Sequence, residues 1–150
     1  MIRSGQSVFS KSHKTSVKKL SLKVPSEIKY IREVSSKVLN ELSKYNIAED
    51  RAFDIRLCVE EAVRNAIVHG NRSNKKLHVK VNYRLENDRI IIEVEDEGAG
   101  FDPRKIADPT GDDNIMKESG RGICLIKRLM DKVDFNQKGN KIRMEKRLWR

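Results

Sequence analysis

Two short segments of the chain carry residue types whose spacing suits the recognition of a base and of a metal ion. Asp96 follows the largely apolar stretch 90–94, and Gly98 and Gly100 come soon after it. An acidic residue that leaves a strand can accept a hydrogen bond from a flat base, and the glycines let the backbone approach that base closely. Upstream, Glu61 and Asn65 are four residues apart. They therefore share one helix face, where they can handle a proton and a hard cation.

A third segment contains Gly120 and Gly122 on either side of Arg121, directly before the apolar stretch 123–130. We expect a helix to begin at this segment and to continue through the apolar stretch. The free N–H groups of its N-terminus could then bind phosphate. A base, a metal ion and a phosphate group therefore each have a candidate site.

Together these segments resemble the ATP-binding superfamily that is shared by DNA gyrase, the ninety-kilodalton heat-shock chaperones, sensor histidine kinases and mismatch-repair ATPases. Within it, the chain is most similar to the small bacterial anti-sigma-factor serine kinases. The resemblance extends from about Ser16 to Leu148. Each motif alone is a weak signal, but three of them in this order and spacing are hard to obtain by chance.

The resemblance implies roles for the candidate residues. Asp96 would accept a hydrogen bond from the amino group of adenine, and Asn65 would coordinate the Mg²⁺ that bridges the phosphates of ATP. Glu61 would lie beside the γ-phosphate and deprotonate an attacking hydroxyl. The other nucleotide-binding candidates are Gly98, Gly100, Gly120 and Gly122, which let the backbone wrap the nucleotide, and the cations Lys117 and Arg121.

Each of these residues also has a simpler structural explanation. Asp96 is a common turn former, and Asn65 and Glu61 fit a solvated helix face. We expect His69 to be structural, because histidine near a helix C-terminus interacts favourably with the helix dipole. Glu118 stands where an arginine would be a natural γ-phosphate contact, which leaves the catalytic cation open.

The composition limits the classes of function. The 150 residues suffice for one domain, and the net charge of +10 is concentrated toward both ends of the chain. Aromatic residues make up only 5%, and no helix carries a basic face interleaved with them, so we expect an acidic protein partner rather than direct nucleic-acid binding. Neither a secretory signal nor an apolar stretch of membrane-spanning length is present, so we expect a cytoplasmic protein with no membrane association.

The composition of residues 1–15 predicts a mobile basic tail, and the apolar pattern predicts a single domain at 16–150, which the resemblance implies is an ATP-binding, kinase-like domain. The predicted fold is α+β: a two-layer sandwich with a mixed, mostly antiparallel sheet and helices on one face, which the resemblance identifies as the Bergerat-type ATP-binding fold. The expected elements are a strand at 17–24, a helix from Ser26 as its cap to about Tyr45, a helix from Glu49 to His69 ended by Gly70, a hairpin at 77–95, a long lid-like connection at 101–119, a helix at 123–130 and a hairpin at 132–149.

The leading functional hypothesis is an ATP-dependent serine/threonine-protein kinase. It would phosphorylate an anti-sigma-factor antagonist and otherwise hold a sigma factor inactive, and formation of a homodimer is compatible with the sequence. One alternative is a nucleotide-dependent binding module without phosphotransfer. Another is a detached histidine-kinase-like ATPase domain, which is disfavoured because His13, His69 and His78 do not lie on a helical dimerisation segment.

Overall fold

Apolar residues at alternate positions place five strands in one sheet of order β1-β2-β3-β5-β4, in which all four neighbouring pairs are antiparallel. The computed structural model describes residues 19–100 and 114–149, and of residues 114–119 it describes the backbone alone. The strands are β1 (Lys19–Pro25), β2 (His78–Glu86), β3 (Arg89–Glu95), β4 (Lys132–Phe135) and β5 (Lys141–Arg147).

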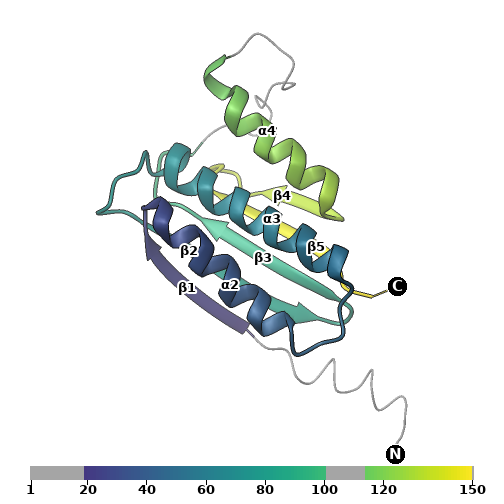
Figure 1. Ribbon diagram of the computed structural model, residues 1–150. Coiled ribbons are helices and arrows are strands. Elements are labelled where there is room, and N and C mark those ends of the chain that lie inside the picture. The colour runs from purple at the N-terminus through teal and green to yellow at the C-terminus, as the bar shows by residue number, and fades with distance from the viewer. Residues whose placement is uncertain (1–18, 101–113, 150) are drawn as a thin grey trace, which may run out of the picture.

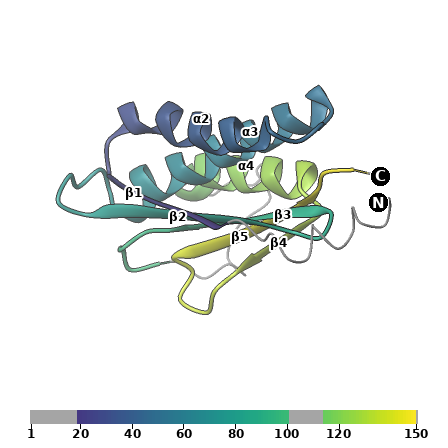
Figure 2. The ribbon, with the colours of Figure 1, turned by 90° about the horizontal axis from the view of Figure 1, so that it is seen from below.

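Three α-helices cover one face of this sheet, as Figures 1 and 2 show. The helical segments are the 3-10 helix η1 (Ile28–Tyr30), α2 (Ile31–Leu42), α3 (Glu49–Asn65), the π-helix η2 (Ala66–Gly70) and α4 (Asn114–Leu129). The predicted α+β two-layer sandwich with helices on one face is therefore confirmed, and every pairing among the described strands is antiparallel.

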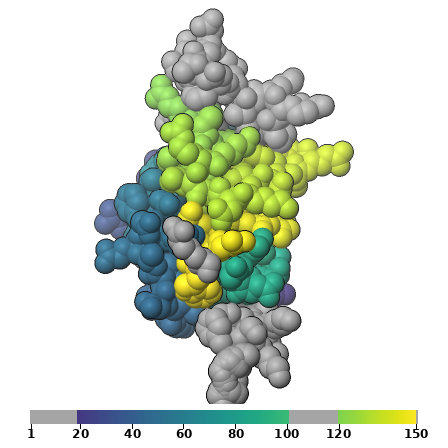
Figure 3. Space-filling model, turned by 90° about the vertical axis from the view of Figure 1, so that its right-hand side faces the viewer, coloured from purple at the N-terminus to yellow at the C-terminus, as the bar shows by residue number. Residues whose placement is uncertain are grey.

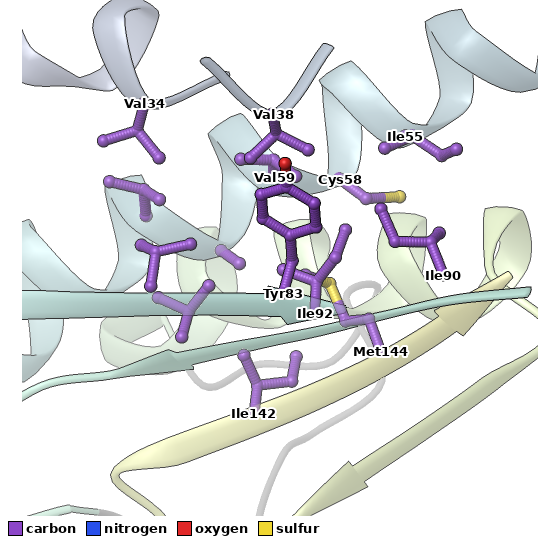
Figure 4. Packing of buried hydrophobic residues seen from close by; sticks show 14 of the residues in the cluster. Val34, Val38, Ile55, Cys58, Val59, Tyr83, Ile90, Ile92, Ile142 and Met144 are labelled. Carbon is purple, nitrogen blue, oxygen red and sulfur yellow. The ribbon is translucent and has the colours of Figure 1, made fainter. Parts of the chain in front are cut away.

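The core lies between the helix layer and the sheet, because each strand turns alternate residues toward the helices. The residues of α3 and η2 that face the sheet form one apolar stripe, and all are at most 5% exposed: Ile55, Val59, Ala62 and Val63 of α3 and Ala66 of η2. Figure 4 shows Ile90 and Ile92 of β3 and Met144 of β5 among the side chains that pack below this helix. This packing holds α3 firmly over the centre of the sheet.

Tyr83 of β2 carries a polar atom into this core. Its side chain is 2% exposed, and its hydroxyl has no hydrogen-bond partner among the described residues (Figure 4). Burial raises the pKa of this phenol, so the group stays neutral. We expect Tyr83→Phe to stabilise the fold by about 1 kcal/mol, because it removes an unsatisfied buried group and keeps the ring. Thermal unfolding should show a Tm higher by about 2–4 °C, and a lower Tm would mean that the hydroxyl has a favourable contact.

The C-terminal segment closes the end of the molecule where α3 begins. Trp149 donates from Nε1 to the carbonyl of Asn46 at 3.0 Å, and its ring meets that of Tyr45 edge to face at 6.3 Å. Figure 3 looks onto this end, where the last residues (yellow) lie between the helices α2 and α3 (blue) and the α4–β4 region (green). β3 finishes at the opposite end of the molecule (Figure 1). Asp96 directly follows β3 and therefore lies at that end.

The prediction that Ser26 caps the first helix is wrong. Its hydroxyl instead donates to the carbonyl of Leu77 at 2.8 Å and accepts from the amide of Asn71 at 2.7 Å, so it joins the start of β2 to the loop after η2. The helix begins as η1 after Glu27 with no side-chain cap, and α2 ends at Leu42 rather than near Tyr45. Ser26 is only 1% exposed. A buried hydroxyl needs hydrogen-bond partners, and these tertiary contacts provide them.

The predicted end of the second helix is also wrong in its detail. The α-helical pattern stops at Asn65, and the chain continues as the π-helix η2 through Gly70. Gly70 has no positive φ, whereas Arg72 and Ser73 have φ values of 52° and 58°. Gly70 therefore does not act as a left-handed cap. A π-helical turn widens the backbone and often occurs at functional sites.

Candidate functional site

A cavity opens where the end of α3, the end of β3 and the β4–β5 turn meet, and its volume is about 220 Å³. Its walls are apolar and come from both layers: Ala62, Ala66, Val94, Ile123, Phe135 and Ile142. Asp96, Asn65 and His69 supply polar groups along its lining. A cavity with apolar walls and a few placed polar groups suits a flat aromatic ligand that carries a polar edge.

Asp96 provides the buried carboxylate of this cavity. The residue is 9% exposed, and one carboxylate oxygen, Oδ1, accepts from the N–H of Gly98 at 2.8 Å. Within the described part of the chain, the other oxygen makes no hydrogen bond. Burial raises the pKa of this carboxyl above its ordinary value, and the Gly98 N–H partly offsets the effect. A desolvated carboxylate with one unused acceptor is prepared for a ligand that donates a hydrogen bond.

Two glycines let the backbone close around Asp96. A Cβ on Gly70 would overlap the Asp96 carboxylate, and a Cβ on Gly98 would overlap the carbonyl oxygen of Gly70. Any larger residue would have to displace the carboxylate or the backbone of η2. Gly70 and Gly98 therefore pack against each other and against Asp96, and the predicted approach of the Gly98 backbone to a base stays a prediction.

The β4–β5 turn forms the opposite wall and fixes the backbone of Asp96. The amide of Asn140 donates to the Asp96 carbonyl at 2.8 Å, and the Asn140 carbonyl accepts from the Asp96 N–H at 2.9 Å. Gly100 has φ of 82°, and a Cβ there would overlap the carbonyl of Lys138. The loop after β3 is thus held against this turn by contacts that only a glycine at position 100 permits.

Glu61 and Asn65 meet Gly122 of α4 beside the cavity. A Cβ built on Gly122 would lie 2.8 Å from Glu61 Oε2 and 3.1 Å from Asn65 Nδ2. The three residues are therefore neighbours in space, although Gly122 is far from the other two in sequence. Glu61 Oε1 also accepts from Arg64 at 3.1 Å.

The adjacent glutamates Glu60 and Glu61 point in different directions from the helix. Glu60 turns toward α2, where its carboxylate accepts from the hydroxyl of Ser35 at 2.6 Å, and Arg56 lies 3.9 Å away. Glu60 therefore contacts Ser35 of α2, whereas Glu61, like Asn65, lies against Gly122 of α4.

Comparison with known proteins identifies the family. A family model described as a histidine kinase-like ATPase domain matches residues 24–146, which include Asp96, Glu61, Asn65 and Gly122. The chain belongs to the histidine kinase-like ATPase domain family. The resemblance predicted from the motifs is therefore confirmed, and use of ATP follows from membership of the family.

Curated relatives of this ATPase domain are small proteins of similar extent. A serine-protein kinase RsbW from Oceanobacillus iheyensis is 28% identical over 134 residues, which cover 85% of each chain. A serine-protein kinase RsbW from Staphylococcus aureus strain Newman is 29% identical over 135 residues, again with 85% coverage of each chain.

A solved structure supports the fold. The crystal structure of the RsbU and RsbW domains from Mycobacterium tuberculosis matches with a TM-score of 0.59 and 18% sequence identity. The match covers 89% of this ATPase domain and spans a third, 33%, of the solved chain. At this identity the likeness concerns the fold alone.

One prediction about the phosphate segment is wrong. Gly120 and Gly122 do not begin a helix, because α4 starts at Asn114 and both glycines lie inside it. Their N–H groups are therefore not those of a helix N-terminus. Gly122 is explained instead by its close contact with α3, Arg121 is exposed on α4, and Lys117 lies on the same helix with its side chain outside the description.

Other predictions fall partly or wholly outside the described residues. The lid-like connection was expected at 101–119, but its last residues, 114–119, are helical, and 101–113 lie outside the description. The basic tail at 1–15 lies outside it as well. No helix among the described residues has the length and apolar character to cross a membrane.

Several residues that build the cavity lie outside the three motifs. Asn71 is 2% exposed, and its side chain accepts from the N–H of Glu97 at 2.8 Å, which ties the loop after η2 to the loop after β3. Asn140 holds the backbone of Asp96, while His69 and Arg72 line the cavity. The sequence signals for Asn71 and Asn140 were the Gly-Asn pairs at 70–71 and 139–140, which also fit ordinary turns, and His69 was expected to have only a structural role at a helix end.

The contact of Gly122 with Glu61 leads to a prediction about the chemistry. With Glu61 as the general base expected from the sequence, Gly122→Ala should push its carboxylate aside and lower phosphate transfer on the order of 10²-fold, because small misplacements of a reacting group are costly. Thermal stability should not fall, since alanine favours a helix interior over glycine by about 1 kcal/mol. Steady-state transfer rates and Tm of the two proteins test this, and unchanged transfer would place the Glu61 carboxylate elsewhere during the reaction.

Proposed function

We propose that this chain is an ATP-dependent serine/threonine-protein kinase and anti-sigma factor. It phosphorylates an anti-sigma-factor antagonist and, when not engaged with the antagonist, sequesters a sigma factor in the cytoplasm. The observation that carries the proposal is the meeting of Glu61, Asn65 and Gly122 next to the cavity that holds Asp96. The kinase names of the curated relatives support it.

Asp96 is proposed to select adenine. Its unused carboxylate oxygen would accept from the exocyclic amino group of the base, between the apolar walls that include Val94 and Ile142. Guanine would present a carbonyl at that position, and two acceptors would then face each other without a proton. Gly98 and Gly100 would let the base approach the backbone.

Asn65 is proposed as the protein ligand of Mg²⁺. Asn65 lines the cavity, and no group of three or more His, Cys, Asp or Glu residues in the described part of the chain forms a metal cage. One neutral amide ligand fits an octahedral ion that retains waters and binds mainly to phosphate oxygens. When bound, the ion would bridge the phosphates and offset their negative charge.

Glu61 is proposed as the general base. Its carboxylate would take the proton of a serine or threonine hydroxyl while that oxygen bonds to the γ-phosphorus and the bond to the bridging oxygen of ADP breaks. The ion pair with Arg64 at 3.1 Å restrains the carboxylate on the side away from Gly122. Gly120 and Gly122 would allow the phosphates to approach α4, with Arg121 and Lys117 as the candidate cations.

A nucleotide-dependent binding module without phosphotransfer is the second candidate function. It is favoured by Glu118, an acidic residue in the part of α4 where an arginine would assist transfer, and by the engagement of Glu61 with Arg64. In this case ATP would still promote capture of a protein partner, but no phosphate would leave the nucleotide.

Incubation of the purified protein with a host lysate and γ-labelled ATP tests the proposal. We expect one small protein to gain acid-stable, base-labile phosphate, which mass spectrometry would locate on serine or threonine. The matched control is Glu61→Gln, which should give no labelled band. Absence of any labelled protein, together with ATP-dependent capture of a partner, would select the binding module instead.

A further inference from the structure

Cationic side chains face one another across β1 and β2 on the sheet face that carries no helix. The antiparallel register puts Lys23 directly opposite Lys80, and Lys19 directly opposite Arg84. The intervening residues, such as Leu22, turn toward the core on the other face. Like charges directly opposite each other destabilise a sheet, so this arrangement costs stability in the isolated protein.

The two cations of β1 face no acidic residue among the described strands, whereas Lys80 of β2 lies directly opposite Glu95 of β3. Lys19, Lys23 and Lys80 are exposed, and none has an ion-pair partner among the described residues. Arg84 is the exception, because it pairs with Glu86 at 3.1 Å. We call β1 together with Lys80 and Arg84 the cationic edge.

Protection against aggregation explains only part of the cationic edge. Lysines on an edge strand discourage pairing with another chain, and β1 is an edge strand of the sheet (Figure 1). That explanation covers Lys19 and Lys23. The cations of the second strand face acidic residues as well, because Lys80 also lies directly opposite Glu95 of β3 and Arg84 pairs with Glu86.

The edge of β1 offers a different chemistry on each of its two faces. In the described part of the chain, no strand pairs with its outer side. Leu20 and Leu22 are only partly buried on the helix side, whereas Lys19 and Lys23 project on the other side. A strand added here would therefore meet apolar side chains at alternate positions and cations at the positions between them.

We propose that the cationic edge binds an extended segment of a protein partner in which acidic and apolar residues alternate. The segment adds to β1 as a sixth strand, its acidic residues lie near Lys19 and Lys23, and its apolar residues cover Leu20 and Leu22. The binding is independent of phosphotransfer, so changes in the cavity do not affect it.

Other occupants of the edge fit its charge less well. A second copy of β1 paired antiparallel about Ser21 would set Lys19 against Lys23, which repeats the like-charge contact. Residues 1–18 of the chain contain Arg3, Lys11, Lys14 and Lys18 but no acidic residue, so they cannot neutralise the lysines. An acidic partner removes the repulsion instead of adding to it.

A synthetic peptide provides a direct test with the full chain. The probe is a capped peptide of alternating glutamate and valine with seven residues, the length of β1. Titration into ¹⁵N-labelled protein should shift the backbone resonances of β1 and slow their hydrogen exchange. Lys23→Glu combined with Lys80→Glu should weaken binding at least about tenfold, and higher salt should weaken binding to the unaltered protein.

Matched controls separate the proposed edge from general charge attraction. Lys127→Glu combined with Arg128→Glu makes the same change in net charge on the exposed side of α4 and should leave the affinity unchanged. A peptide with its glutamates and valines in separate blocks should bind more weakly than the alternating one. Lys23→Glu alone, which replaces a like-charge pair with an opposite one, should fold with an undiminished Tm.

Several outcomes would overturn the proposal. These are no binding of the alternating peptide, equal loss in the two double variants, resonance shifts that map away from β1, or tighter binding of a short single-stranded RNA than of the peptide. Loss of kinase activity in Glu61→Gln with peptide binding intact would leave the edge in place, so the two proposals fail separately.

Discussion

Replacement of Asp96 by asparagine should reduce affinity for ATP by about 1.5–3 kcal/mol and at the same time stabilise the protein without nucleotide. The loss follows because an amide is a weaker and differently oriented acceptor than a carboxylate for the adenine amino group. It corresponds to an increase in Kd on the order of 10- to 150-fold.

The gain in stability follows from the direction of the pKa shift. Burial raises the pKa of Asp96 above that of an unfolded aspartate, so ionisation costs stability once the pH exceeds the unfolded value. The cost disappears as the pH falls below that value. The asparagine side chain of the Asp96→Asn variant stays neutral at pH 7 and can still accept from the Gly98 N–H. The Tm of the variant should therefore rise at pH 7 and match that of the unaltered protein more closely at low pH.

Calorimetry with ATP and GTP and thermal unfolding without nucleotide measure both effects. The matched control is Glu97→Gln, since Glu97 is the adjacent acidic residue but points its carboxylate at the N–H of His78, away from the cavity. It should leave ATP affinity nearly unchanged. Equal affinities of the unaltered protein for ATP and GTP would remove Asp96 from base selection.

Replacement of Glu61 by glutamine should lower phosphate transfer on the order of 10²–10⁴-fold while ATP and the protein partner still bind. Glutamine keeps the shape and the contact with Gly122 but cannot take a proton. Asn65→Ala should instead weaken the magnesium-dependent binding of ATP itself. Single-turnover transfer assays and nucleotide titrations with and without Mg²⁺ distinguish these effects.

Glu60→Gln is the matched control for Glu61. The two glutamates are adjacent, but Glu60 accepts from Ser35 of α2 and does not approach Gly122. Its variant should transfer phosphate at the original rate. If Glu61→Gln transfers as fast as Glu60→Gln, another group accepts the proton.

The sequence by itself determined the parts of the site that depend on local periodicity. A helix repeat brings Glu61 and Asn65 to one face and sends Glu60 to another, and this holds whatever the helix packs against. A strand repeat delivers Asp96 to the end of β3, and alternation predicts the core-facing side of each strand. For the same reason, the fold class of strands in hairpins with helices on one face was predictable.

Only the tertiary structure decided which distant residues complete the site. The glycines at 120 and 122 predicted the start of a helix, but α4 extends through them, because Gly122 removes the Cβ that would otherwise collide with Glu61. Gly70 was predicted to cap a helix, yet its backbone conformation is ordinary, and its missing side chain makes room for Asp96. Local sequence preferences show that a glycine allows many backbone conformations and close contacts. They cannot show whether the space left by its missing side chain is needed for a turn, for helix packing or for a carboxylate, because that depends on contacts between elements far apart in the chain.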